Sequence, residues 1–593
     1  MSSSPSSVDE NTKDIIKIIV LKNAIQYGGK ARNEIVISKT IAQRPDLRNN
    51  LKILIPEIKV SVEKINSLTL NEQKVLFAHM VPQQPTRDIK KKDHATSLPA
   101  LQNAEMGNVM TRFPPEPNGY PHLGHAKAAI IDEEYARMYN GKLILRFDDT
   151  NPLNEKAEYY DAIKGGLEWL GIEPDIVKNT SDDIQLLCDY GKKLVEIGGA
   201  YVCTCSQPVM RDLRSKGIPC NCRLDTSQAR GLLRKFFDDS FEPNAAVVRF
   251  KGNMADQNTA MRDPTLFRII DGHHPKLGNS NRVWPTYDFA APLEDSLDGV
   301  THALRTKEYE LRNPLYFAIL ERLSLRKPLM LEFSRLEFEG MPVSKRKIKP
   351  LIENGLVKGW NDPRLPTLES IKRRGFLPQA IRKFVLSLGL TLAETKPPFE
   401  ALEAFNRKIV DPQSIRLFFV KDPVQLQVRN GDFTRQVTLN NHPNINLGHR
   451  NIRVSNCFYI AGDDAASLRV GDEIRLMELY NVRIGDIKSQ QISQHGSASS
   501  DTSKLIIAEQ TGDYLEHDMP KIQWVAVEDA IPYRIVIPKA LYIEENYNTN
   551  SLETCEGFAE SYVSTLKQGT IIQFVRFGFC RIDGDNNAIF AHR

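Results

Sequence analysis

Residues 112–125 read Arg-Phe-Pro-Pro-Glu-Pro-Asn-Gly-Tyr-Pro-His-Leu-Gly-His, and this stretch decides the fold around it. A strand-like run (Asn108–Phe113) precedes the prolines, and helical spacing continues over Ala126–Tyr135. Free backbone N–H groups and the helix dipole both favour anions at a helix N-terminus. The stretch therefore predicts a phosphate cradle with His122 and His125 at the start of a helix, and so nucleotide chemistry.

Strand and helix patterns alternate after this stretch. Lys142–Phe147 is typical of a strand and Ala157–Leu170 of a helix, which predicts a parallel, doubly wound α/β sheet of the Rossmann type. The first residues show helical spacing, and the residues after about 418 show the period-two alternation of strands. We expect a helical N-terminal domain (1–82), a linker (83–105), the two halves of the α/β domain (106–200 and 284–350), an insertion with clustered cysteines (201–283), a helical connecting domain (351–418) and an all-β region (419–593).

Length and composition limit the possible classes of protein. A chain of 593 residues needs several hydrophobic cores. Its net charge of +4 means that any polyanion must meet local basic patches. The Ser-rich start has no signal-peptide pattern, and no apolar run approaches the length of a membrane span. We therefore expect a cytoplasmic protein that does not bind membranes.

A second candidate motif lies far downstream, where Met341–Lys347 reads Met-Pro-Val-Ser-Lys-Arg-Lys after a strand-like run. Alone, His-x-x-His could be a pair of metal ligands or an accident of sequence, and Lys345 could be a solvated lysine. Two separated signals in this order are far less expected by chance. Together they indicate that His122, His125 and Lys345 surround one triphosphate.

The two motifs resemble the HIGH and KMSKS motifs of class I aminoacyl-tRNA synthetases, written here His-Leu-Gly-His and Val-Ser-Lys-Arg. Leu123 replaces isoleucine in the first motif, and Pro342-Val343 replaces the first lysine and the methionine of the second. The resemblance narrows to the glutamyl/glutaminyl subgroup through the segments 112–119, 146–152, 284–290, 299–308 and 335–336. Tyr27-Gly28-Gly29-Lys30-Ala31 is similar to the helical domain of archaeal glutamyl-tRNA synthetases.

The resemblance implies a role for each matching residue. His122, His125 and Lys345 would be the catalytic groups, supplying positive charge to the phosphates of ATP·Mg²⁺. Arg112 would hold the carboxylate of the amino acid, and Asp148 and Tyr287 its amino group. Gly124 would allow the nucleotide to approach the backbone closely. The ATP-binding set would be Pro114, Glu116, Asn118, His122, Gly124, His125, Arg335, Leu336, Ser344 and Lys345.

Arg305 bears on the choice between glutamate and glutamine. In the resembling glutaminyl enzymes this position is small and neutral, whereas archaeal and eukaryotic glutamyl enzymes carry arginine. A desolvated γ-carboxylate needs a cation, and a buried arginine facing a neutral amide would be under-paired. Arg305 thus favours L-glutamate as substrate. Two alternatives stay open: a glutamine-tRNA ligase, since residues 112–119 read more like the glutaminyl wording, and a non-catalytic synthetase-like RNA-binding protein.

Cys203, Cys205, Cys220 and Cys222 form two Cys-x-Cys pairs, a reasonable set of ligands for a structural zinc ion. The alternative is four reduced cysteines without metal, because a gap of one residue is less typical than a gap of two to four. Through the resemblance, the insertion would bind the acceptor end of tRNA(Glu) and the all-β region its anticodon loop. Whether tRNA(Gln) is also a substrate stays open, and no DNA partner is expected.

Overall fold

The computed structural model describes residues 10–26, 29–43, 51–80, 98–224, 229–238, 240–343, 345–394, 396–430, 435–491, 502–514 and 519–593. The chain divides into two compact units, Met1–Ala95 and Thr96–Arg593. Within the part of the chain that is described, every helix is too short or too polar to cross a bilayer.

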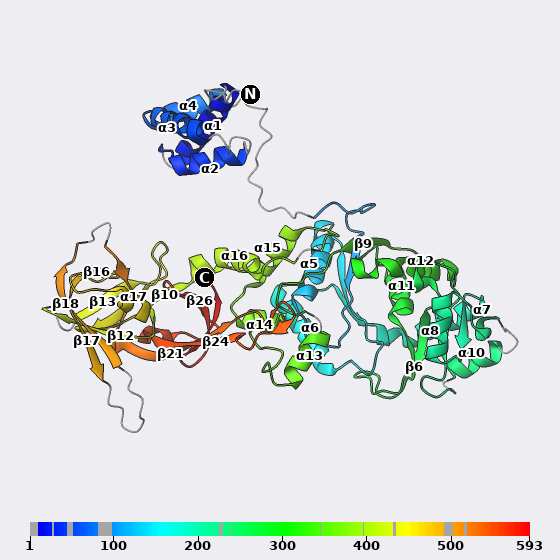
Figure 1. The fold of residues 1–593 in the computed structure, drawn as a ribbon. Helices are drawn as coiled ribbons and strands as arrows, with labels where there is room; N and C mark the ends of the chain where they lie inside the picture. The colour runs from blue at the N-terminus through cyan, green and yellow to red at the C-terminus, as the bar shows by residue number, and fades with distance from the viewer. Residues whose placement is uncertain are drawn as a thin grey trace. The chain divides into compact units, whose positions relative to one another are not determined.

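The first unit is helical, as the sequence predicts. Ile16, Leu21, Val36 and Ile58 are buried in its core. Helix α1 ends at Gln26 and α2 begins at Asn33; Gly29 between them has a φ of +103°, which disfavours other residues, and Tyr27 and Gly28 lie outside the described residues. The helices are α1 (Glu10–Gln26), α2 (Asn33–Gln43), α3 (Leu51–Asn66) and α4 (Leu70–Met80) (Figure 1).

Parallel strands form the centre of the second unit. Strands β1 (Met110–Phe113), β2 (Lys142–Phe147) and β3 (Ile176–Asn179) form one parallel sheet, and β8 (His302–Thr306) pairs in parallel with β9 (Leu329–Phe333). The two sheets adjoin where Thr301 and Met110 exchange hydrogen bonds. The carboxyl ends of these strands therefore lie at one edge, where open α/β sheets bind their ligands.

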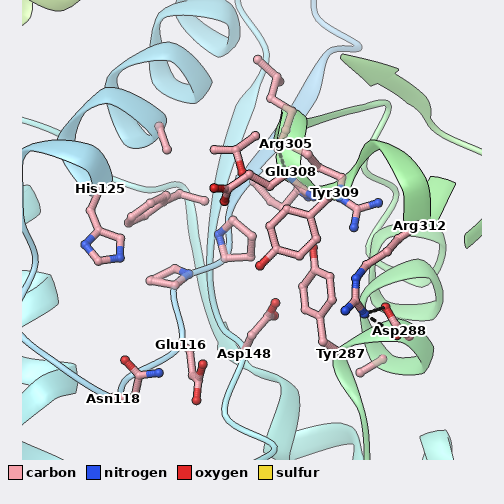
Figure 2. Close-up of a pocket in the computed structure, with 18 of the residues that line it drawn as sticks. Glu116, Asn118, His125, Asp148, Tyr287, Asp288, Arg305, Glu308, Tyr309 and Arg312 are labelled. Carbon is pink, nitrogen blue, oxygen red and sulfur yellow. Dashed lines mark hydrogen bonds and ion pairs between the residues drawn. The ribbon is translucent and has the colours of Figure 1, made fainter. Parts of the chain in front are cut away.

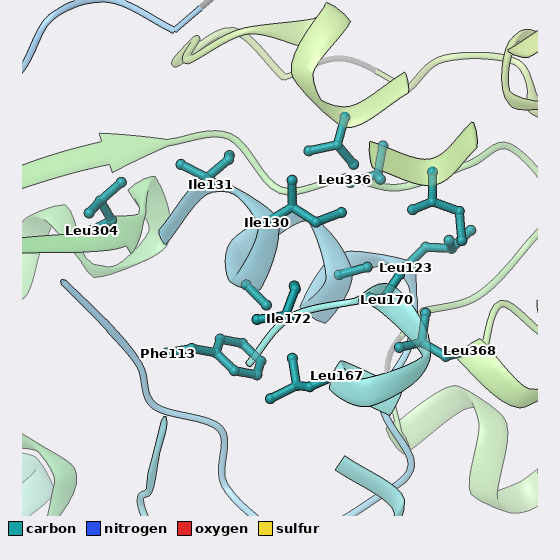
Figure 3. Packing of buried hydrophobic residues seen from close by; sticks show 14 of the residues in the cluster. Phe113, Leu123, Ile130, Ile131, Leu167, Leu170, Ile172, Leu304, Leu336 and Leu368 are labelled. Atoms are coloured by element: carbon teal, nitrogen blue, oxygen red, sulfur yellow. The ribbon is translucent and has the colours of Figure 1, made fainter. Parts of the chain in front are cut away.

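Helix α5 (Leu123–Met138) crosses the main hydrophobic core. Its Leu123, Ile130 and Ile131 are almost fully buried, in the same cluster as Phe113 of β1 and Leu304 of β8 (Figure 3). Because apolar residues of α5 bury against both strands, the turn before α5 is fixed relative to the sheet. Other helices of the α/β part are α6 (Ala157–Leu170), α7 (Ile184–Glu196), α11 (Tyr287–Leu297) and α12 (Asn313–Arg322).

An antiparallel sheet interrupts the α/β part. Its strand order is β4-β5-β6-β7, which differs from the parallel pairing on either side. The strands are β4 (Ala200–Cys203), β5 (Val247–Phe250), β6 (Thr265–Ile269) and β7 (Val283–Pro285). Helices α8 (Gln207–Lys216), α9 (Asn221–Leu224) and α10 (Ala229–Phe237) lie between β4 and β5 in the sequence. The interruption runs from Ala200 to Pro285, against the 201–283 expected for the insertion, whose bounds stay a prediction.

Helices then lead into a strand-rich region, which is not purely β as expected because it contains the short helix α17 (Gly462–Ser467). They are α13 (Lys345–Glu353), α14 (Leu368–Arg373), α15 (Pro378–Leu388) and α16 (Phe399–Val410). The strands begin with β10 (Ile415–Leu417), slightly before the predicted boundary at 418, because β10 pairs with a strand near the C-terminus.

Two seven-stranded sheets dominate this region. The first contains β10, β11 (Phe419–Lys421), β21 (Ala530–Pro538), β24 (Leu552–Glu560), β25 (Ile571–Phe574), β26 (Gly578–Gly584) and β27 (Asn587–His592). The second contains β12 (Val424–Arg429), β15 (Cys457–Ile460), β16 (Glu473–Leu476), β17 (Asn481–Gln491), β18 (Thr502–Gly512), β19 (Lys521–Ile522) and β20 (Trp524–Ala526).

Each large sheet has its own hydrophobic core, so the region consists of two strand-rich bodies. Smaller pairs are β13 (Arg435–Asn440) with β14 (His449–Val454), and β22 (Tyr542–Ile543) with β23 (Asn546–Tyr547). The predicted fold class is confirmed, while the division into seven parts stays a prediction.

Candidate active site

A cavity of about 760 Å³ opens at the carboxyl ends of the parallel strands. Figure 2 shows His125, Asn118 and Glu116 on one side of it and Tyr287 with Tyr309 on the other. Its lining includes the following residues predicted from the sequence: Arg112, Pro114, Glu116, Asn118, His122, Gly124, His125, Asp148, Tyr287, Arg305, Arg335 and Leu336. Segments distant in sequence therefore meet in one place, although the roles given to these residues stay predictions.

The two histidines form the N-terminal cap of α5. His122 is the N-cap residue, and its Nδ1 accepts a hydrogen bond from the backbone N–H of Gly124 (3.1 Å). His125 Nδ1 accepts one from the backbone N–H of His122 (3.2 Å). The ring centroids are 3.9 Å apart. With Nδ1 accepting on both rings, the neutral form of each carries its proton on Nε2 and donates from that atom.

The histidines do not supply the positive charge expected from the sequence. Burial, together with the nearby positive charge of Arg335, lowers the pKa of His125 to about 4. Burial, His125 and Arg335 also hold the pKa of His122 well below its usual value. Both rings are therefore neutral near pH 7. They offer hydrogen-bond donors to a phosphate, which is a weaker but still directional interaction.

Gly124 has a packing role that the sequence did not reveal. A Cβ at this position would lie 2.9 Å from atoms of the His122 ring. Any larger residue would therefore displace the imidazole from the helix cap. The glycine is required by the neighbouring histidine in addition to its predicted role beside the nucleotide.

The second motif is only partly described. Ser344 lies outside the described residues, and nothing is described of the Lys345 side chain. The backbone of Lys345 begins α13 (Lys345–Glu353). Val343, immediately before it, lines the cavity. The motif therefore borders the same cavity as the histidines.

Asp148 follows β2 and lies in the floor of the cavity. Its Oδ1 accepts hydrogen bonds from Arg146 Nε (3.1 Å) and Thr180 Oγ1 (3.2 Å). Its Oδ2 is buried without a hydrogen-bond partner among the described residues. Burial raises the pKa of this carboxyl although Arg146 opposes the shift. A ligand ammonium group at Oδ2 would restore the missing partner.

A buried ionic network supports this floor. Arg112 of β1 donates to Asp295 Oδ1 (3.0 Å) and to the carbonyl of Leu304 (2.7 Å). Arg146 lies 2.8 Å from the same carboxylate oxygen. Burial opposes ionisation of Asp295, but the two arginines outweigh it and lower its pKa to about 2. Asp295 thus fixes both guanidinium groups, a role with no local sequence signal.

Arg305 of β8 is buried among aromatic rings. Its guanidinium carbon lies 4.9 Å from the ring centroid of Tyr309 and 5.5 Å from those of Tyr287 and Tyr316. Nη1 donates to Asn313 Oδ1 (3.2 Å), and Nε is buried with no partner among the residues that the structure describes. In the described part of the chain, no carboxylate pairs with this arginine. A buried cation without a counter-ion is costly, so the cavity is suited to an anionic ligand group here.

Several lining residues were missed by reasoning from the sequence. Tyr309 and Arg312 belong to the 3-10 helix η4 (Lys307–Arg312), and Arg312 pairs with Asp288. They could have been found by extending the segment 299–308 by one helical turn. Arg214 and Arg268 come from the insertion and also line the cavity. Only the tertiary structure brings these two arginines to the site.

The four clustered cysteines come together as expected. Cys203 ends β4 and Cys220 precedes α9, and the Sγ atoms of these two residues lie 3.9 Å apart. The sulfur atoms of Cys205 and Cys222 lie 3.6 Å apart, and all four Sγ atoms are within 4.8 Å of one another. Four thiolates on a tetrahedral zinc ion would lie about 3.8 Å apart, given a Zn–S distance of about 2.3 Å. The donor set fits zinc.

Comparison with family models gives matches that extend over most of the second unit. Residues 108–412 match the model described as tRNA synthetases class I (E and Q), catalytic domain. Residues 414–499 and 521–583 match two models described as the anti-codon binding domain of the same group.

Similar proteins match over nearly the whole length. The glutamate–tRNA ligase of Cenarchaeum symbiosum is 49% identical over 97% of this chain and 98% of its own. That of Nitrosopumilus maritimus is 46% identical over 99% of this chain and 100% of its own. That of Korarchaeum cryptofilum is 36% identical over 97% of this chain and 98% of its own. The similarity includes the helical first unit as well as the cavity.

Proposed function

The chain belongs to the class I tRNA synthetases of the E and Q group, and we propose on this basis that it activates L-glutamate with ATP and ligates it to tRNA(Glu). In the first step, the glutamate α-carboxylate attacks the α-phosphorus of ATP, giving glutamyl-adenylate and pyrophosphate. In the second, a hydroxyl of the terminal adenosine of tRNA takes the glutamyl group and AMP leaves. A single assay, pyrophosphate exchange, distinguishes this proposal from the two alternatives, a glutamine ligase and a non-catalytic protein.

The observation that carries the choice of glutamate is the environment of Arg305. This buried guanidinium lines the cavity and has no carboxylate partner in the described chain. A γ-carboxylate would complete an ion pair there, whereas a glutamine side chain would leave the charge uncompensated. Arg305 therefore selects an anionic substrate side chain.

The other groups of the cavity divide the remaining contacts. Asp148 takes the substrate ammonium group at its unpartnered Oδ2, with the Tyr287 ring beside it. Arg112 faces the α-carboxylate, held in place by Asp295. His122 and His125 donate from Nε2 to the phosphates, and Lys345 holds the leaving pyrophosphate. Mg²⁺ bound to ATP would supply further positive charge to the phosphates.

Pyrophosphate exchange tests this proposal. The full chain, with tRNA(Glu) present, should exchange pyrophosphate into ATP with glutamate far faster than with glutamine. A preference for glutamine would contradict the role of Arg305 and support a glutaminyl enzyme. Exchange with neither amino acid would support the non-catalytic alternative.

Two regions contribute the contacts to tRNA in this proposal. The insertion binds the acceptor end, with Arg214 and Arg268 facing the cavity. The strand-rich bodies bind the anticodon loop, where unstacked bases are accessible. Charging assays with purified tRNA(Glu) and tRNA(Gln) test whether the second tRNA is also accepted. We place the enzyme in the cytoplasm, where its tRNA substrates are used.

The four cysteines would hold a structural zinc ion that stiffens the insertion. Measuring metal in the purified full chain should give close to one zinc per chain. The Cys220→Ser/Cys222→Ser variant should lose the zinc, and Cys457→Ser, a cysteine outside the cluster, is the matched control. Purified wild-type protein without zinc, but with full charging activity, would favour the alternative of four reduced cysteines.

A further inference from the structure

Asn313 lies between Arg305 and an acidic residue of the next strand. Glu332 of β9 is the register partner of Arg305 in the parallel β8–β9 pair, so the two side chains project from the same face. The two residues nevertheless form no ion pair in the structure. Instead, Arg305 Nη1 donates to Asn313 Oδ1 (3.2 Å), and Asn313 Nδ2 donates to Glu332 Oε1. One amide therefore lies between the cation and the acidic side chain of the neighbouring strand.

The hydrogen bonds fix which way the Asn313 amide faces. An ionised carboxylate only accepts hydrogen bonds, so Glu332 must face the NH₂ group of Asn313. The amide oxygen then has to face Arg305, which only donates. Because both neighbours demand the same orientation, the amide cannot flip without losing both bonds.

The consequence is a guanidinium that is held in position but not neutralised. The aromatic rings of Tyr287, Tyr309 and Tyr316 surround it, and Asn313 offers only a neutral acceptor. A carboxylate in place of that amide would neutralise Arg305 before any substrate arrives. We propose that Asn313 is a positioning residue that determines specificity for glutamate. Its amide binds Glu332 and keeps this carboxylate away from Arg305, so that the charge of Arg305 is available to the substrate γ-carboxylate. This inference rests on the proposed activation of glutamate.

A two-residue exchange tests it directly. The Asn313→Asp/Glu332→Gln variant keeps the same net charge and the same number of hydrogen-bonding side chains, but it moves the carboxylate next to Arg305. Pyrophosphate exchange with tRNA(Glu) present should show kcat/KM for glutamate falling about a hundredfold, as expected for about 3 kcal/mol lost from a buried charge pair. The glutamate-to-glutamine ratio should fall at least tenfold, while KM for ATP stays unchanged.

Two further variants separate the effect of where the carboxylate lies from the effect of removing the Glu332 charge. Glu332→Gln alone leaves Arg305 unneutralised and still accepts from Asn313, so its selectivity should remain near that of the wild type. Asn313→Ala lets Glu332 reach Arg305 directly and should lower the ratio even if the double variant folds poorly. Thermal unfolding of each variant checks that the cavity is intact.

The outcomes distinguish this inference from the proposed function. If the wild type activates glutamate selectively and the folded double variant has the same glutamate-to-glutamine ratio, the role of Asn313 is wrong and the proposed function stands. If the wild type itself fails to activate glutamate, the proposed function fails first. A lower ratio in both the double variant and Asn313→Ala supports the inference.

Discussion

The two sides of the cavity use opposite kinds of chemistry. On the α5 side, two neutral imidazoles are held by backbone N–H groups at a helix cap. On the β8 side, Arg305 is a buried cation, and the buried Arg112 and Arg146 share Asp295. The α5 side depends on hydrogen bonds between residues that are close in sequence. The β8 side depends on charged residues that the tertiary structure brings together.

The difference follows from what each side has to do in the proposed reaction. Phosphates must be held and then released as pyrophosphate, so the neutral donors of α5 orient them while Lys345 of the second motif supplies the charge. The amino acid must be distinguished from one that differs only by amide for carboxylate. A desolvated charge gives a larger difference in binding free energy between glutamate and glutamine than neutral donors do, because an unpaired buried charge costs several kcal/mol.

The largest effect should come from removing the cation on the β8 side. Arg305→Gln should lower kcat/KM for glutamate about a thousandfold, because the γ-carboxylate would enter the cavity without a counter-ion. Glutamine activation should change less than about tenfold, since its neutral amide needs no counter-ion. Pyrophosphate exchange with both amino acids measures this. Arg137→Gln is the control, since Arg137 is exposed, paired with Glu133 and outside the cavity lining, and it should leave the ratio nearly unchanged.

The second motif should contribute the next largest effect. Lys345→Ala should lower the rate of adenylation about a hundredfold or more, as expected when one preorganised charge contact is lost from a transition state. Single-turnover formation of glutamyl-adenylate measures the step. Its neighbour Lys349 has an exposed side chain paired with Glu353, so Lys349→Ala is the control and should be near wild type. Near-normal adenylation by Lys345→Ala would contradict the proposed hold on the pyrophosphate.

The two nitrogen atoms of His125 should be separable by substitution. Asparagine can replace the Nδ1 acceptor that caps α5, and glutamine can replace the Nε2 donor. His125→Asn should therefore keep stability but slow adenylation, by about a hundredfold for loss of one donor. His125→Gln should keep stability as well, because a glutamine three residues after the N-cap can accept from the N-cap N–H, and it should keep more activity than His125→Asn. If both variants lose activity equally without a change in stability, the division of roles between the nitrogens is wrong.

The smallest expected effect is the dependence of stability on pH. The pKa of His125 is about 4 in the folded chain, against an ordinary value of 6.5. The unfolded chain therefore binds more protons between these values. The stabilisation is complete above pH 6.5 and is lost as pH falls towards 4. Thermal unfolding at pH 7 and pH 5 should show the wild type losing about 2 kcal/mol more than His125→Asn. Equal losses would mean that His125 titrates normally.

Sequence reasoning succeeded where function depends on local order. The strand, turn and helix around residues 112–125 were predictable because prolines, glycine and apolar spacing act on the residues beside them. The four cysteines were recognised from their spacing. The charge state of the histidines was not predictable, because it depends on burial and on Arg335, which is far away in the sequence but close in the structure. The contact that holds the first motif against a later segment was not predictable either: the Leu123 N–H donates to the carbonyl of Pro366.

The amino-acid sequence by itself determined the order of the elements, the family resemblance and the set of groups able to bind a nucleotide and an amino acid. The tertiary structure alone decided which of those groups carry charge and which partners they keep. Asp295 and Asn313 show the reason. Their effects act through side chains of other strands, and whether a buried charge is compensated depends on everything packed around it.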